Sequence, residues 1–248
     1  MRNGEKQFRV RVENSDNPGD GFTAGPTLRV RVVENLGAGN IADAFAEAIL
    51  KIDRAGRALA LPKAGKDASW RELFIANACN LRCTFCCESV RIGQGTLMPW
   101  EQIETVLRSY AADGVKVVQF MGGEPSIHPR FCDALRLSRE LGMRNYAITN
   151  LLQWRKRDFA EEVGPLLDEL MISMHALGEQ SGSLVTGRKY WWKQFQEGVE
   201  NAQQTLTGRV YGATVLSKNN VDDLEQIGAA LAALGASKWV MGNSVPIA

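Results

Sequence analysis

The chain has 248 residues and a formal net charge of +1, with charged residues spread along the whole sequence. This length accommodates one large α/β barrel, or one domain with a small appendage. A near-neutral charge gives no electrostatic reason to expect nucleic acid or an anionic membrane as a partner. No apolar run approaches the ~20 residues that span a bilayer, and the first residues lack the apolar core of a signal peptide. We therefore expect a cytoplasmic protein.

Residues 1–66 differ in pattern from the rest of the chain. Two stretches, 8–12 and 28–32, alternate apolar and charged side chains with the period of two that is typical of half-buried strands. Turn-forming residues lie between them, a helical face follows from Asn40 to Ile52, and a short apolar run comes last. We predict a small β-β-α-β extension, followed by a polar linker.

From residue 67 to residue 248, strand-like apolar runs alternate with amphipathic helical faces. Sequential strands joined by helices pair most naturally in parallel, through right-handed crossovers. The sequence therefore predicts the α/β class and a partial (β/α)6 barrel of parallel strands, with its chemistry at the carboxyl ends of the strands. The expected strands are Leu73–Ala76, Val115–Met121, Tyr146–Thr149, Leu170–Met174, Val210–Leu216 and Trp239–Met241. The expected helices are centred on Ile103–Tyr110, Phe131–Leu141, Phe159–Val163, Trp192–Ala202 and Leu224–Leu234.

Four of the five cysteines lie within nine residues, from Cys79 to Cys87. Thiols this close together cannot join distant segments by disulfides, so a metal site is the better interpretation. The spacing CxxxCxxC selects Cys79, Cys83 and Cys86, in the loop that follows the first barrel strand. Three thiolates on one short loop can bind three irons of a cubane cluster and leave the fourth iron open to another ligand.

Cys87 does not fit this spacing. Starting the pattern at Cys83 makes Cys87 the second ligand and puts Val90 in the third place, so that register fails. Cys87 is therefore a spare thiol, either packed in the interior or in contact with substrate. Two other classes stay open for the cluster: a zinc-binding module, which wants four closed ligands, and a non-catalytic iron–sulfur electron-transfer protein, which needs a fourth cysteine ligand.

A second motif, Gly122-Gly123-Glu124-Pro125, follows the second barrel strand. Two glycines let the backbone approach a ligand closely, and Glu124 offers a carboxylate to an ammonium group. By itself the motif is equally consistent with a plain turn between strand and helix. Its place after a CxxxCxxC loop on the preceding strand favours a binding site at the shared edge of the barrel.

These two motifs, in this order and with Phe85 directly before the last cysteine, resemble the signature of the radical S-adenosylmethionine superfamily, in its branch with a GGEP motif. The resemblance implies a [4Fe–4S] cluster on the three cysteines, whose open iron chelates the amino and carboxylate groups of S-adenosylmethionine. It also implies that the GGEP motif holds the amino group. Electron transfer then breaks a carbon–sulfur bond, giving methionine and a 5′-deoxyadenosyl radical that abstracts hydrogen from a substrate.

The resemblance further implies an external electron donor such as flavodoxin or ferredoxin. The branch includes enzymes of molybdenum-cofactor synthesis and peptide-modifying maturases, so the expected substrate is a peptide or a small molecule in peptide, cofactor or natural-product biosynthesis. The chain ends just after the sixth strand. It is therefore either a minimal member or a piece of a longer protein.

Polar residues also follow the later strands. Thr149-Asn150 ends the third strand, where the family pattern continues with glycine and this chain has Leu151. Ser173 ends the fourth strand and resembles the family's contact to the cofactor, with simple barrel packing as the alternative. His175 is a cofactor contact, a proton donor to substrate, or a hydrogen-bonded strand-end residue. Val215, at the end of the fifth strand, packs either against adenine or in the barrel core.

Overall fold

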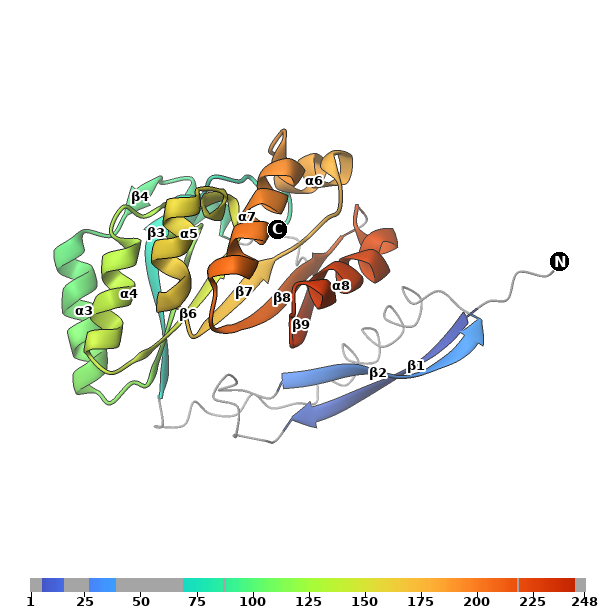
Figure 1. Cartoon of the computed structure of the whole chain (residues 1–248), viewed down its shortest axis with the longest axis horizontal. Helices are drawn as coiled ribbons and strands as arrows, with labels where there is room; N and C mark the ends of the chain where they lie inside the picture. Colours follow the sequence, from blue (N-terminus) through green and yellow to red (C-terminus); the bar gives the residue numbers. More distant parts are fainter. Residues whose placement is uncertain (1–5, 16–26, 39–68, 87, 218, 244–248) are drawn as a thin grey trace. The chain divides into compact units, whose positions relative to one another are not determined.

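The computed structural model describes residues 6–15, 27–38, 69–86, 88–217 and 219–243. The chain divides into two compact units, Met1–Ala68 and Ser69–Ala248 (Figure 1). In the first unit, β1 (Lys6–Ser15) pairs antiparallel with β2 (Thr27–Ala38), so the two alternating stretches are strands as predicted. The helix and third strand expected in this extension lie outside the described residues, and its assignment as a separate domain stays a prediction.

The second unit is built on one mostly parallel sheet, which confirms the predicted fold class. Its strand order is β4-β3-β5-β6-β7-β8-β9, and every neighbouring pair is parallel except β3 with β4. All six predicted strands are present. The strands are β3 (Trp70–Asn77), β4 (Thr96–Leu97), β5 (Val117–Gly122), β6 (Arg144–Thr149), β7 (Glu169–Ser173), β8 (Arg209–Leu216) and β9 (Lys238–Asn243).

Helices connect successive parallel strands and follow in chain order along the sheet (Figure 1). The five predicted helices are α3 (Trp100–Ala112), α4 (Phe131–Glu140), α5 (Arg157–Val163), α7 (Trp191–Thr205) and α8 (Leu224–Ala233). Three elements were not expected from the sequence: the short helix α2 (Ser89–Ile92), the edge strand β4 and the helix α6 (Glu179–Thr186). None of the helices that the structure describes is long and apolar enough to cross a bilayer.

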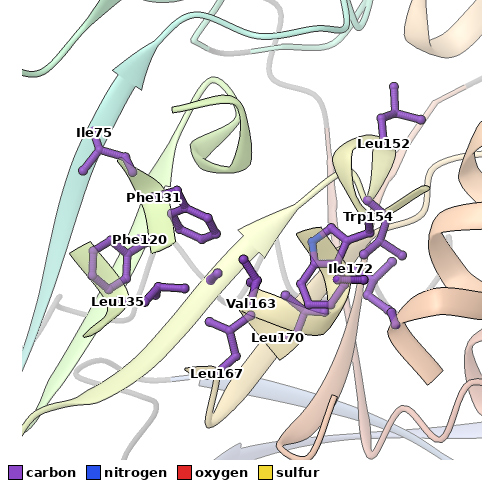
Figure 2. Close-up of a cluster of buried hydrophobic side chains, with 14 of the residues drawn as sticks. Ile75, Phe120, Phe131, Leu135, Leu152, Trp154, Val163, Leu167, Leu170 and Ile172 are labelled. Carbon is purple, nitrogen blue, oxygen red and sulfur yellow. The ribbon is translucent and has the colours of Figure 1, made fainter. Parts of the chain in front are cut away.

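The hydrophobic core lies between the sheet and the helices that cover it. Strand β7 shows the expected alternation, because Leu170 and Ile172 are buried whereas Met171 and Ser173, on the other face, are half-buried. Figure 2 shows this core, with strand residues such as Phe120 beside helix residues such as Phe131. The helix-facing side of the sheet is therefore filled, and the carboxyl ends of the strands are left to carry a site.

Candidate functional site

The ends of β3 and β5 are joined through the glycine motif. The backbone N–H of Gly123 donates to Ala76 O at 2.8 Å, and that of Glu124 donates to Ala78 O at 2.9 Å. A Cβ atom on Gly122 would lie 2.3 Å from Ala76 O, and one on Gly123 would lie 2.3 Å from Ala78 O. The close approach that both glycines allow is thus to the chain's own backbone, directly before Cys79.

Glu124 is the most completely bonded side chain at this edge, and it is 1% exposed. Its Oε1 accepts hydrogen bonds from Ser126 N (3.1 Å), Ser126 Oγ (2.6 Å) and Thr149 Oγ1 (2.8 Å), and its Oε2 accepts one from Asn150 N (2.7 Å). Burial raises the pKa of Glu124, and the donors from Ser126, Asn150 and Thr149 lower it. Since each carboxylate oxygen has two lone pairs, Oε2 retains capacity for one further donor. Pro125 begins the 3-10 turn η2 (Pro125–Ile127) directly after this residue.

Cys79, Cys83 and Cys86 lie together, half-buried, in the loop after β3. Burial raises the pKa of Cys79 to about 12, with smaller contributions from the charges of Glu124 and Cys86. Burial likewise raises the pKa of Cys83 to about 12, helped by Cys79 and Cys86. The three thiols are therefore within electrostatic reach of one another. Cysteines bind iron as thiolates, so a cationic cluster at this loop would stabilise the charge that burial disfavours.

This donor set fits a cubane cluster. Among the described residues, no three His, Cys, Asp or Glu side chains converge on a single metal-ion position. A cubane does not require such convergence, because each cysteine binds a different iron. The sulfur of Cys79 already accepts a hydrogen bond from Leu81 N at 3.4 Å, which is a contact suited to a thiolate ligand.

Helix α6 supports the cysteine loop through a second set of backbone hydrogen bonds. Arg82 N donates to Thr186 O at 2.9 Å, and Thr84 N donates to Val185 O at 3.0 Å. The last carbonyls of a helix have no intrahelical partner, so the loop completes the carboxyl end of α6. Gly187 has φ +65°, and a Cβ there would lie 2.7 Å from Arg82 O. The only sequence signal for this support was a glycine suited to end a helix.

Three further predicted residues meet at the ends of β7 and β8. His175 is 8% exposed, its Nδ1 accepts a hydrogen bond from Val215 N at 3.1 Å, and its ring meets the ring of Phe85 edge-on at 4.6 Å. Burial lowers the pKa of His175 to about 4. The ring is therefore neutral at pH 7, and the accepting role of Nδ1 assigns its proton to Nε2. Ser173 lies half-buried at the end of β7.

Three further polar residues near these strand ends were not identified as site residues from the sequence. Asn220 lies at the N-cap position of the 3-10 turn η5 (Val221–Asp223), and its Nδ2 donates to His175 O and Val215 O, both at 2.8 Å, and so joins the two strand ends. His128 is buried, with Nε2 2.9 Å from Met98 O. The sequence also missed Asn80, whose Oδ1 accepts a hydrogen bond from Asn150 Nδ2 at 2.8 Å.

The sequence was compared with those of curated proteins, and GTP 3′,8-cyclases are among its relatives. A GTP 3′,8-cyclase from Pectobacterium atrosepticum is 29% identical over 152 residues, which are 59% of this chain and 46% of that protein. One from Pelotomaculum thermopropionicum is 27% identical over 209 residues, covering 74% of this chain and 62% of that protein. The chain spans about half the length of the first of these relatives.

Solved structures show the same fold at low identity. The structure of Streptococcus suis SuiB bound to S-adenosylmethionine has a TM-score of 0.62 and 16% identity, and covers 86% of this chain and 48% of that one. Native anSMEcpe with bound AdoMet has a TM-score of 0.59 and 15% identity, and covers 71% and 51%. The family model described as the radical SAM superfamily matches residues 73–231, more than half of the sequence. This chain therefore belongs to the radical SAM superfamily.

Proposed function

We propose that this chain is a radical SAM enzyme of the branch with a GGEP motif, and that Cys79, Cys83 and Cys86 hold its [4Fe–4S] cluster. Family membership implies both this cluster and S-adenosylmethionine. When both are bound, the reduced cluster would supply the electron that cleaves a carbon–sulfur bond of S-adenosylmethionine, giving methionine and a 5′-deoxyadenosyl radical for hydrogen abstraction. The reducing electron comes from an external donor of the flavodoxin or ferredoxin kind.

The observation that carries the proposal is the backbone pairing between the glycine motif and the start of the cysteine loop. Glu124 N donates to Ala78 O at 2.9 Å, one residue before Cys79. A ligand bound to a cluster on this loop would therefore lie near the motif as well. This arrangement needs both glycines, because a Cβ on Gly122 would collide with the backbone of Ala76 in β3, and one on Gly123 with the backbone of Ala78 just after it.

The chemistry of each surrounding residue suits a different part of S-adenosylmethionine. The remaining lone pair of Glu124 Oε2 suits an ammonium group, which makes the motif the amino-group site. His175 Nε2–H is a neutral donor held in one tautomer by Val215 N, and Ser173 offers a hydroxyl on the same strand end. Phe85 and Val215 supply apolar surface suited to adenine. The backbone of Gly122, Gly123 and Pro125 shapes the edge against which the ligand lies.

For the substrate, we propose a peptide. The second unit, Ser69–Ala248, is about 73% of the chain, whereas the match to SuiB covers 86%, so that match extends beyond the second unit. SuiB has also been solved bound to precursor peptide SuiA. The match to anSMEcpe covers 71%, about the share of the second unit alone. A purine nucleotide is the second candidate, because the curated relatives are GTP 3′,8-cyclases.

The test is anaerobic reconstitution with iron and sulfide, followed by reduction in the presence of S-adenosylmethionine. The expected result is a brown protein with a [4Fe–4S] EPR signal that S-adenosylmethionine perturbs, and release of 5′-deoxyadenosine. Cys83→Ala abolishes both cluster and cleavage, whereas Cys132→Ala, a half-buried thiol in α4, retains both. A colourless protein that binds zinc, or a cluster whose spectrum ignores S-adenosylmethionine, would refute the enzyme proposal. Product analysis with peptides and with GTP then separates the two substrate classes.

A further inference from the structure

Asn150 lies at the end of β6 with its side chain 6% exposed, and every polar atom of its carboxamide has a partner. Its Oδ1 accepts a hydrogen bond from Leu152 N at 3.1 Å. Its Nδ2 donates to Asn80 Oδ1 at 2.8 Å and lies 3.9 Å from Cys79 Sγ, within range for a sulfur acceptor. Because Leu152 N–H can only donate, it fixes the accepting oxygen and leaves the NH2 group facing the cysteine loop.

The same asparagine is bonded through its main chain to the glycine motif. Its backbone N–H donates to Glu124 Oε2 at 2.7 Å. Asn80, its side-chain partner, directly follows Cys79 and is held from the other side, because Arg188 Nη1 donates to Asn80 O at 3.1 Å. One buried residue thus joins the GGEP carboxylate to a cysteine of the cluster loop.

Two N–H groups are directed at the sulfur of Cys79, from Leu81 N at 3.4 Å and from Asn150 Nδ2 at 3.9 Å. An amide NH2 has two donors, so it can serve Asn80 and the sulfur together. Donors to a ligating sulfur stabilise the more negative, reduced form of an iron–sulfur cluster and raise its reduction potential. The Leu81 donor belongs to the backbone, so the Asn150 donor is the one that a substitution can remove.

We propose that Asn150 is a positioning residue that raises the reduction potential of the cluster by donating from its side chain to the Cys79–Asn80 segment. The inference rests on the proposed function, since it assumes a [4Fe–4S] cluster on Cys79. In the sequence, Asn150 is recognisable only as a polar residue at the end of a strand. The role differs from that of Glu124, which is to bind the amino group of S-adenosylmethionine.

The test is an EPR-monitored redox titration of the reconstituted holoprotein. In Asn150→Ser the hydroxyl can still accept from Leu152 N but is too short to reach the loop, and no charge is added. The expected result is a midpoint potential shifted to more negative values. In Asn150→Asp an acceptor replaces the donor at nearly equal size and adds negative charge, so the negative shift is larger. The matched control is Asn219→Ser, the same change at an exposed asparagine after β8, which leaves the potential unchanged.

The outcomes separate this inference from the proposed function. If wild type and both Asn150 variants hold a cluster with the same midpoint potential, the tuning role is wrong while the enzyme proposal stands. Loss of the cluster in both variants, with retention in Asn219→Ser, also counts against tuning, because it makes Asn150 a requirement for assembly. A wild type that assembles no [4Fe–4S] cluster overturns the proposed function and this inference together.

Discussion

Leu151 offers a direct test of how this strand end is built. It has φ +62° and ψ −1°, in the left-handed region where the family pattern has glycine, yet its side chain is fully buried. A left-handed conformation costs a residue with a Cβ roughly 1–2 kcal/mol, and truncating a buried leucine costs about 3–5 kcal/mol. The burial outweighs the strain, which explains why leucine is tolerated here. Both Leu151→Ala and Leu151→Gly are therefore expected to destabilise the protein by about 3–5 kcal/mol.

The neighbouring residue Leu152 supplies the control that isolates the strain. It is equally buried at 2% exposed, and it lies within the 3-10 turn η3 (Leu152–Arg155), outside the left-handed region. At Leu152 glycine should be less stable than alanine by about 1–2 kcal/mol, from backbone entropy and one lost methyl group. At Leu151 glycine adopts the left-handed conformation without strain, so glycine and alanine variants should differ in unfolding free energy by about zero.

The assay is urea unfolding of the four reduced, metal-free variants, monitored by tryptophan fluorescence. Trp154 is buried in the same turn and reports on it directly. The quantity of interest is the glycine-minus-alanine difference in unfolding free energy at Leu151 compared with Leu152, expected to differ by about 1–2 kcal/mol. The same difference at both sites would refute the claim that Leu151 stores backbone strain.

Three further predictions concern the site. Glu124→Gln places an amide NH2 against either Asn150 N–H or the three donors on Oε1, so unfolding should become easier by about 2–4 kcal/mol in urea titrations; unchanged stability would contradict this. Gly123→Ala should lower iron content after reconstitution, because its Cβ meets Ala78 O at 2.3 Å, whereas Gly242→Ala, with open space, should not. For His175, the unfolded chain binds a proton below pH 6.5 and the folded protein only near pH 4. As the pH is lowered from 6.5 to 4, the free energy of unfolding should therefore decrease by about 3 kcal/mol, and this decrease should be absent from His175→Gln.

The parallel sheet was predictable because short apolar runs, typical of buried strands, alternate along the chain with segments of helical periodicity. Val117, Val118 and Phe120 lie in one buried run of β5, and Leu224, Ile227 and Leu231 repeat at helical spacing in α8. The cysteine and glycine motifs were predictable for another reason: spacing and order identify them before any coordinate is known. The structure then brings the two motifs together at the ends of adjacent strands.

Helix α6 was not predictable because its sequence, Glu179–Thr186, is a poor helix former with two serines and a glycine. It is a helix through tertiary packing. A Cβ on Gly182 would lie 2.2 Å from the ring of Trp191, so the glycine is what lets α6 approach the next helix. Strand β4 has two residues, too few to show any period. The burial of His128 depends on Met98 O, thirty residues earlier in the chain.

The cysteine loop explains why one part of the site has a recognisable motif and another has none. Glu124 N–H donates to Ala78 O at its start, next to the bond from Gly123 N–H to Ala76 O in β3, and the loop itself donates to the last carbonyls of α6. Both contacts are made by the main chain, so neither dictates side chains except where backbones come too close for a Cβ atom. At the first contact two adjacent glycines beside a buried carboxylate make a motif. At the second the one sterically required residue is Gly187, which any helix end could have. The α6 contact can therefore vary widely in sequence while it holds the cluster loop equally well.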